Sequence, residues 1–382
     1  MSVRRTLTLL SAICCSLCFV VFPVQAEGNL TAPYVAAQSY YLLEQESEQV
    51  LAALNPDLRV EPASLTKLMT AYLTFQALHD KTLSSNQTVP VSQHAWKSPG
   101  SRMFIEPQRP VTVNELIHGV IIQSGNDASV ALAEAISGSE EAFAQRMNKT
   151  AATLGMINTH FVNATGLPDP QHYSSAHDLA LLATALVRDF PEYYPLYALK
   201  EYRYNGITQP NRNRLLWMDP TVDGLKTGHT DSAGYCLISS AKRGERRLLS
   251  VVLGANSDLA RTTESQKLLN WGFQTFQSRR LFQKNAVVKT LEVYKGAARA
   301  VKTAFDQDIW VTYPAGEEAR ARELLTTLQP VIAPVAVGQK LGNLDVSYDG
   351  KVLFSHALSA AEAVPVGNAF TRGWDSVRLM LK

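Results

Sequence analysis

Ser64 and Lys67 stand three residues apart at the start of a predicted helix, within the stretch Pro62-Ala63-Ser64-Leu65-Thr66-Lys67-Leu68-Met69. Residues three apart lie on the same side of a helix, so the serine hydroxyl and the lysine amine should face the same way. Apolar residues recur at the spacing of an amphipathic helix, whose apolar face we expect to be buried, at Leu65, Leu68, Met69, Tyr72 and Leu73.

A serine hydroxyl becomes a useful nucleophile at neutral pH only with a base within hydrogen-bond reach. Lysine can supply that base when burial or nearby cations lower its pKa and favour the neutral amine. The N-terminus of the helix adds free N–H groups and a positive dipole end, which favour negative charge on the carbonyl oxygen of an acylated serine. Taken alone, the four-residue pattern is also compatible with a serine that only caps the helix, beside a solvated lysine.

The composition is that of an ordinary globular protein, with 382 residues of which 46% are hydrophobic and 18% charged. This length predicts two or three domains with a buried core. The formal net charge of +2 provides no overall basic field of the kind that nucleic-acid-binding proteins carry. We therefore expect no nucleic-acid partner.

Residues 1–26 have the pattern of a secretory signal peptide. Arg4 and Arg5 precede an apolar run that ends near Val21, and Val24-Gln25-Ala26 supplies a small-x-small cleavage pattern. The run is too short for a comfortable membrane span. Three of the four cysteines lie in this leader, so the mature chain keeps only Cys236 and cannot form an intramolecular disulfide. We expect an exported protein stabilised by its core alone.

In the first part of the mature chain, strands are predicted at both ends and helices between them. Strands are predicted near residues 34–53, 222–230, 235–241 and 246–254. Helices are predicted at 112–123, 127–136, 139–154, 175–189 and 261–276. This order predicts one sheet assembled from both chain ends and flanked by a helical lobe, which we assign to a domain of residues 27–284.

Residues 285–364 have a different pattern, with short alternating runs punctuated by Gly, Pro and Asp. We predict a small all-β domain with strands at 287–294, 301–305, 309–312, 329–336, 339–348 and 351–357. The segment carries no acid–base cluster and no metal-ligand spacing. A role as a spacer or docking domain is the only one that its sequence suggests.

The tail at residues 365–382 is short and amphipathic. Phe370, Trp374, Val377 and Leu381 fall on one helical face, and the basic residues Arg372, Arg378 and Lys382 lie elsewhere. An aromatic face with basic flanks is typical of a helix that lies in a membrane interface. An ordinary docked tail is the alternative.

Three short motifs follow one another on elements where they can converge. They are Ser64-Leu65-Thr66-Lys67 at the helix start, Ser124-Gly125-Asn126 in a break between two helices, and Lys226-Thr227-Gly228 on a strand. Each is weak alone. In this order, in an exported chain, they resemble the S-x-x-K, S-x-N and K-T-G boxes of the active-site serine penicillin-recognising enzymes. Residues 62–67, 123–128 and 223–231 are more closely similar to the D-alanyl-D-alanine carboxypeptidases among the low-molecular-mass penicillin-binding proteins.

This resemblance covers essentially the mature chain. It implies a β-lactamase/transpeptidase-like sheet with a helical lobe, followed by a small all-β C-terminal domain and a membrane-anchoring tail. It also implies a periplasmic enzyme on the inner membrane that removes the terminal D-alanine from peptidoglycan stem pentapeptides and is inhibited covalently by β-lactams. Neither a cofactor nor a metal ion is expected.

The resemblance also implies roles for individual residues. Ser64 would be the acylated nucleophile and Lys67 its general base, with Ser124 and Asn126 completing a proton relay and orienting the substrate amide. Lys226 would help to keep Lys67 neutral by like-charge repulsion. The remaining substrate-binding residues are Thr227 and Arg212 for the terminal carboxylate, Gly228 of the K-T-G box, and His229, whose backbone N–H would form an oxyanion hole with that of Ser64.

The motifs are also compatible with two other functions of the same superfamily, a D,D-endopeptidase and a β-lactamase. A weakly active cell-wall scaffold is a further alternative. The loop at residues 163–169 offers no separate carboxylate that we would assign to deacylation, which argues against efficient penicillin turnover. His118, His160, His172 and His177 lack metal-ligand spacing and are interpreted as structural.

Overall fold

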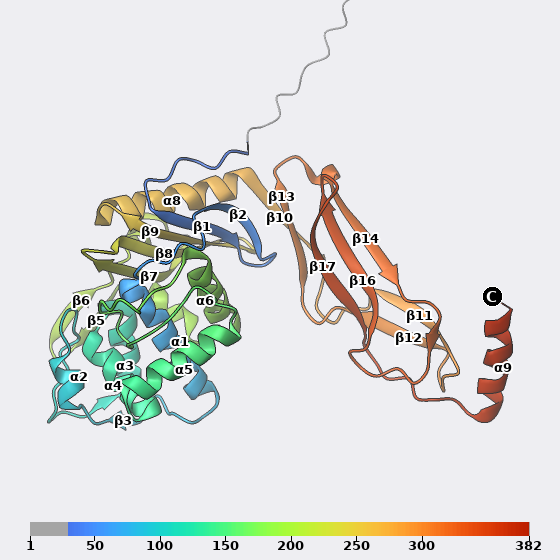
Figure 1. Cartoon of the computed structure of the whole chain (residues 1–382), viewed down its shortest axis with the longest axis horizontal. Helices are drawn as coiled ribbons and strands as arrows, with labels where there is room; N and C mark the ends of the chain where they lie inside the picture. Colours follow the sequence, from blue (N-terminus) through green and yellow to red (C-terminus); the bar gives the residue numbers. More distant parts are fainter. Residues whose placement is uncertain (1–29, 382) are drawn as a thin grey trace, which may run out of the picture. The chain divides into compact units, whose positions relative to one another are not determined.

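The computed structural model describes residues 30–381, so the predicted signal peptide lies outside the described residues. Its central feature is a five-stranded antiparallel sheet in the order β2-β1-β9-β8-β7 (Figure 1). The strands are β1 (Ser39–Glu44), β2 (Gln49–Leu54), β7 (Val222–Thr230), β8 (Gly234–Arg243) and β9 (Arg246–Ala255). Because β1 pairs directly with β9, the prediction of one sheet built from both ends of this part of the chain is confirmed.

Helices cover both faces of the sheet. α8 (Asp258–Thr275) packs on one face, where Leu268 and Leu269 join Leu42, Leu237 and Val252 in a buried cluster. The larger helical lobe covers the other face (Figure 1). It contains η1 (Ala63–Thr66), α1 (Lys67–His79), α2 (Gln93–Lys97), α3 (Val113–His118), η2 (Gly119–Gln123), α4 (Asn126–Ser137), α5 (Glu140–Thr153) and α6 (Ala176–Asp189).

Short elements complete this part of the chain. The hairpins are β3 (Thr88–Val89) with β4 (Val111–Thr112), and β5 (Glu201–Tyr204) with β6 (Ile207–Pro210). The remaining short helices are η3 (Tyr194–Ala198) and α7 (Leu215–Met218).

The helix α1 is buried almost all round, and the prediction of an amphipathic helix is therefore wrong. All residues from Lys67 to Phe75 are buried. Its polar residues are satisfied internally, since the Thr70 hydroxyl donates to the Ala164 carbonyl (2.7 Å) and the Thr74 hydroxyl donates to the Thr70 carbonyl (2.7 Å). The helix lies inside the lobe, and the helices around it supply contacts that the spacing of its own residues does not reveal.

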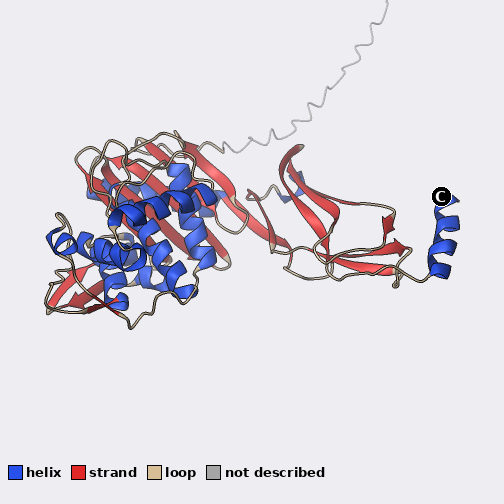
Figure 2. Cartoon of the chain, turned by 60° about the horizontal axis from the view of Figure 1, so that its bottom comes forward, coloured by secondary structure: helices blue, strands red, loops and turns tan. Residues whose placement is uncertain are grey.

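The C-terminal part of the chain is built of strands, which confirms the predicted all-β fold. Apart from the short η4 (Glu318–Arg320), Figure 2 shows strands and loops that end in a helix. A six-stranded sheet has the order β14-β16-β17-β12-β11-β15. Its strands are β11 (Lys289–Tyr294), β12 (Ala300–Ala304), β14 (Ala321–Thr327), β15 (Val331–Ile332), β16 (Lys340–Tyr348) and β17 (Lys351–Ala360).

The strands β10 (Phe276–Phe282) and β14 were not predicted from the sequence. β10 pairs with β13 (Ile309–Pro314), and β14 pairs with β16. Most residues of β10 and β14 are exposed or half-buried, so they lack the run of buried side chains that marks a strand in a sequence. Pairing with a neighbour supplies their order instead. The division between residues 284 and 285 stays a prediction.

The tail forms the helix α9 (Ala369–Met380), with its aromatic side chains exposed. Phe370 is 84% exposed and Trp374 is 59% exposed. The opposite side is attached to the β-rich part, where the Asp375 carboxylate accepts a hydrogen bond from the Lys295 backbone N–H (2.6 Å) and Arg378 pairs with Glu292 (2.6 Å). Within residues 30–381, no helix is long and apolar enough to cross a membrane.

Candidate active site

Ser64 and Lys67 meet where η1 runs into α1. The Lys67 Nζ donates a hydrogen bond to the Ser64 Oγ at 3.0 Å. A second bond from the same amine runs to the Thr165 carbonyl oxygen at 2.5 Å. The backbone therefore holds the amine beside the hydroxyl, in the geometry that a serine–lysine nucleophile requires.

Lys67 is only 1% exposed, and this burial decides its ionisation. Burial, helped by the positive charge of Arg212, lowers the pKa of Lys67 from 10.5 to about 7. The negative charges of Asp127 and Glu140 act in the opposite direction. A large share of the amine is thus neutral at neutral pH, and only the neutral amine can take a proton from Ser64.

Lys226 is the second buried amine of the site. Burial, together with the repulsion between Lys226 and Lys67, lowers the pKa of Lys226 well below its usual value. Lys226 itself donates to the Ser124 Oγ at 2.9 Å and to the Thr227 carbonyl at 3.0 Å. The site therefore holds two serine–lysine pairs, and within residues 30–381 no direct hydrogen bond joins one pair to the other.

The backbone around Ser124 and Gly228 brings the three motifs together. Ser124 ends η2 in the left-handed conformation, with φ of 59°, and this turns its side chain toward Lys226. Gly228 lies against η1, because a Cβ atom at this position would stand 2.9 Å from the Pro62 carbonyl oxygen. Glycine is thus the residue that allows β7 to approach η1, which carries Ser64, closely.

Asn126 lies beside a wall formed by residues 99–105. Its amide nitrogen donates to the Pro99 carbonyl at 2.6 Å, while its buried Oδ1 has no hydrogen-bond partner among the described residues. The neighbouring carboxylate of Asp127 accepts hydrogen bonds from the backbone N–H groups of Met103 (2.9 Å), Phe104 (2.8 Å) and Ile105 (3.2 Å). The two residues thereby attach this wall to the start of α4.

A cavity of about 470 Å³ opens at Ser64. Of the predicted site residues, Ser64, Ser124, Arg212, Thr227, Gly228 and His229 line it, and Lys67, Asn126 and Lys226 are not among its lining residues. The rest of the lining is Gly100, Ser101, Tyr235, Asp258 and Arg261. The imidazole of His229 is exposed, with its ring centre 4.0 Å from that of Tyr235.

Arg261 is a cavity residue that the sequence analysis missed. It comes from α8 and is buried, and it donates to the Gly228 carbonyl (3.0 Å) while pairing with Asp258. Its Nε has no hydrogen-bond partner in the part of the chain described by the structure. The predicted helix at 261–276 contained this arginine, but no motif spacing linked it to Ser64. The available signal was a charged residue at the start of a helix that must pack on a sheet.

No group of three or more His, Cys, Asp or Glu residues able to hold a metal ion occurs within residues 30–381. His172 is buried and bonded at both ring nitrogens, to the Thr66 hydroxyl (2.8 Å) and to the Val162 backbone N–H (3.1 Å). Burial lowers the pKa of His172 to about 4, so it is neutral at physiological pH and packs beside the nucleophile's helix.

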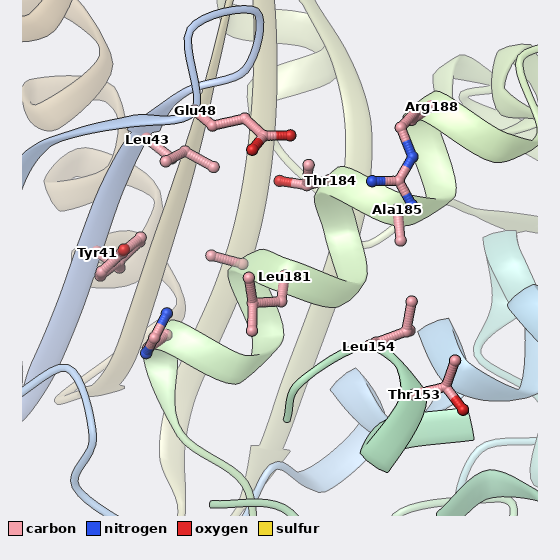
Figure 3. Close-up of a pocket in the computed structure, with 11 residues that line it drawn as sticks. Tyr41, Leu43, Glu48, Thr153, Leu154, Leu181, Thr184, Ala185 and Arg188 are labelled. Carbon is pink, nitrogen blue, oxygen red and sulfur yellow. The ribbon is translucent and has the colours of Figure 1, made fainter. Parts of the chain in front are cut away.

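A separate cavity of about 320 Å³ lies along α6. Figure 3 shows Glu48, Thr184 and Arg188 around it, with Leu43, Leu154 and Leu181 nearby. It shares no lining residue with the cavity at Ser64 and contains no serine–lysine pair. The chemistry of the three motifs therefore belongs to the cavity at Ser64.

Comparison with known proteins gives the same answer over almost the whole chain. The D-alanyl-D-alanine carboxypeptidase family matches residues 26–257, and the C-terminal domain of penicillin-binding protein 5 matches residues 276–366. The D-alanyl-D-alanine carboxypeptidase DacC of Escherichia coli is 42% identical over 93% of this chain and 90% of its own length. DacA of Haemophilus influenzae is 40% identical over 94% of each chain.

Solved structures agree. Penicillin-binding protein 5 from Haemophilus influenzae superimposes with a TM-score of 0.83 at 40% identity, covering 88% of this chain and 99% of that one. The resemblance found in the three motifs is thus confirmed. The chain belongs to the D-alanyl-D-alanine carboxypeptidase family and is a serine-type D-Ala-D-Ala carboxypeptidase of peptidoglycan remodelling, with the C-terminal domain of penicillin-binding protein 5.

Proposed function

We propose that Ser64 is the nucleophile of this carboxypeptidase and that Lys67 is its general base. The observation that carries the proposal is a buried amine with a pKa of about 7 lying 3.0 Å from the Ser64 Oγ. In acylation the Ser64 oxygen attacks the carbonyl carbon of the penultimate D-alanine, and its proton passes to the Lys67 amine. The bond to the terminal D-alanine then breaks, and the released amine takes up the proton held by Lys67, which becomes neutral again.

Deacylation reverses the roles. Water attacks the acyl carbon and gives a proton to the Lys67 amine, which then passes it to the Ser64 oxygen as that oxygen leaves as the hydroxyl. Ser124, which accepts a hydrogen bond from Lys226, is proposed to relay the proton from Lys67 to the departing amine during acylation. Asn126 has a buried Oδ1 with no hydrogen-bond partner within residues 30–381, which suits the N–H of a substrate amide. We assign the oxyanion hole to the backbone N–H groups of Ser64 and His229.

The terminal carboxylate of the substrate needs cations and hydroxyl donors in the same cavity. Arg212, Thr227 and Arg261 line the cavity and supply two guanidinium groups and one hydroxyl. A guanidinium pairs with a carboxylate through two parallel hydrogen bonds, which recognises the end of a peptide chain. This recognition favours a carboxypeptidase over an endopeptidase that cuts within cross-links.

A β-lactam would occupy the same cavity and acylate Ser64. Penicillin-binding protein D2 of Listeria monocytogenes, which is 32% identical over 64% of this chain with a TM-score of 0.59, was solved in an ampicillin-bound form. The strained lactam carbonyl presents an acyl group, and the carboxylate of the β-lactam would face Arg212, as we propose for the carboxylate of the terminal D-alanine.

The proposal is tested by intact mass after incubation with benzylpenicillin, with the adduct mapped to a peptide, beside release of D-alanine from a diacyl-D-Ala-D-Ala peptide. We expect one adduct on Ser64 and loss of both activities in Ser64→Ala. Cross-linked muropeptides in the same assay measure endopeptidase activity, and slow regeneration of free enzyme measures β-lactamase activity. An unlabelled Ser64, or an unchanged Ser64→Ala variant, contradicts the proposal.

The acylation rate should depend on pH through Lys67. Because the folded pKa of Lys67 is about 7 and the neutral amine is the base, the rate should rise about tenfold per pH unit below pH 7 and level off above it. Stopped-flow acylation by benzylpenicillin between pH 5 and pH 9 measures this profile. A rate that stays flat down to pH 5 would show that another group is the base.

We also propose that α9 attaches the enzyme to the periplasmic face of the inner membrane. The helix exposes Phe370, Trp374 and Val377 along one side, while Asp375 and Arg378 hold its other side to the β-rich part. A helix of 12 residues with an exposed aromatic face fits the interface of a bilayer, where aromatic side chains are favoured.

Replacing Phe370 and Trp374 together with serine should abolish sedimentation with vesicles of anionic phospholipid and leave D-alanine release from a soluble peptide unchanged. The matched control is Leu328→Ser, which removes an exposed apolar side chain from the β-rich part. Equal vesicle binding by wild type and the double variant would contradict the anchoring role.

A further inference from the structure

Glu140 is the first residue of α5 and bonds to the loop that receives the hydrogen bond from Lys67. Its Oε1 accepts from the Ala164 backbone N–H at 2.9 Å. The next residue, Thr165, offers its carbonyl oxygen to the Lys67 Nζ at 2.5 Å. One carboxylate is therefore bonded to the backbone of the residue that precedes Thr165, whose carbonyl oxygen accepts from the proposed catalytic amine.

The loop is held at other points as well, so the position of the Thr165 carbonyl is closely determined. The Asn163 side-chain oxygen accepts from the backbone N–H groups of Thr165 (3.1 Å) and Gly166 (2.7 Å). Gly166 packs so tightly on η1 that a Cβ atom there would lie 1.8 Å from the Ala63 carbonyl oxygen. A movement of this loop would thus displace both the amine and the backbone of the nucleophile.

Charged groups surround Glu140 on each element that packs against it. Its Oε2 lies 2.8 Å from the Nε2 of His94 on α2, and Lys97 of α2 lines the same small cavity. Glu134 of α4 and Glu141 of α5 add negative charge near His94, and with Glu140 they raise the pKa of His94. The side chain of Glu140 is only 12% exposed, so water and salt screen its charge poorly toward the interior of the protein.

That charge reaches the catalytic amine. Glu140 and Asp127 both raise the pKa of Lys67, against the larger effects of burial and Arg212. A base whose pKa fell far below the working pH would be fully neutral but too weak to accept the proton of a serine hydroxyl. A buried carboxylate beside the loop opposes such a fall.

We propose that Glu140 is a positioning residue for the acylation of Ser64, which holds the Thr165 carbonyl against Lys67 through Ala164 and adjusts the basicity of the amine by its charge. The inference rests on the proposed role of Lys67 as the base. A carboxylate in the first turn of a helix also stabilises the helix dipole, and the neighbouring Glu141 has that property without the contact to the loop. Glu141 therefore provides the matched control.

The test is the pH profile of Ser64 acylation by benzylpenicillin, measured for wild type, Glu140→Gln, Glu140→Ala and Glu141→Gln. Glutamine keeps an oxygen for the Ala164 N–H but removes the charge, so the acidic limb should move down by about half a pH unit to one unit. Alanine removes the hydrogen bond as well, and the plateau rate should fall about tenfold or more as the amine loses its alignment. Glu141→Gln should reproduce the wild-type profile.

The inference would be overturned if the acidic limb of the pH profile stayed unchanged in both Glu140 variants. It would also be overturned if Glu141→Gln moved the limb equally, because the effect would then belong to any charge at this helix end. Thermal unfolding of Glu140→Ala separates misfolding from misalignment, and the near-isosteric Glu140→Gln keeps the limb shift measurable if alanine is not tolerated. A wild type that is labelled at Ser64 while Glu140→Gln is unchanged contradicts this inference alone. A wild type without labelling contradicts the proposed function and this inference together.

Discussion

Replacing Lys67 with alanine should slow the acylation of Ser64 by benzylpenicillin by about 10²–10⁴-fold, the range that a positioned general base contributes. The reason is that no other amine lies within hydrogen-bond distance of the Ser64 Oγ among the described residues, since Lys226 is bonded to Ser124. Release of D-alanine from a diacyl-D-Ala-D-Ala peptide should fall by a similar factor.

The measurement is the second-order rate of adduct formation by intact mass. Lys67→Met separates catalysis from folding, because methionine fills the same space without an amine. Taking a buried, partly charged group out of the core should leave the unfolding temperature of this variant equal to or above that of the wild type. An exposed lysine of the β-rich part, Lys289, supplies the control substitution Lys289→Ala. A fall of less than fivefold in Lys67→Met would exclude Lys67 as the base.

Replacing Asp127 with alanine should lower the free energy of unfolding by about 3–5 kcal/mol and the unfolding temperature by about 10 °C. The buried carboxylate accepts hydrogen bonds from four backbone N–H groups. Three belong to Met103, Phe104 and Ile105 in the segment 99–105, and the fourth belongs to Ala128 (2.9 Å) in its own helix. Without it these buried donors lose their acceptor, which costs more than the hydrogen bonds themselves contribute.

Differential scanning calorimetry measures the change, and acylation by benzylpenicillin reports the cavity. We expect acylation to fall as well, because Gly100 and Ser101 line the cavity just before the segment that Asp127 holds. Asp127→Asn keeps one acceptor oxygen and should lose less stability than the alanine variant. The exposed Asp231→Ala should change the unfolding temperature little. A shift below 2 °C in Asp127→Ala would contradict the structural role given to this carboxylate.

Much of the architecture was readable from local pattern. The strand predicted at residues 222–230 is β7, and the helices predicted at 139–154 and 175–189 are α5 and α6 within a residue or so at each end. Periodic burial and clear capping residues make such elements visible in a sequence, and Ser139 and Ser175 indeed cap these two helices. The exposed strands β10 and β14 lacked that signal.

The contact between Ser64 and Lys67 was likewise predictable, because a spacing of three on a helix is a local property. Ser64, Lys67, Ser124 and Lys226 could be named from their motifs. The pairing of Ser64 with Lys67 follows from this local spacing. The pairing of Ser124 with Lys226 does not, because these residues are 102 positions apart in the chain.

The sequence by itself therefore determined the residues to which we assign the chemistry and the order of the elements that present them. The tertiary structure decided the surroundings of those residues: the burial of Lys67, the Thr165 carbonyl that receives its hydrogen bond, and the placement of Arg261 in the cavity. These features depend on contacts between segments far apart in the chain. A pKa is set by the solvent and charges that surround a group in space, and neither can be read from its neighbours in sequence.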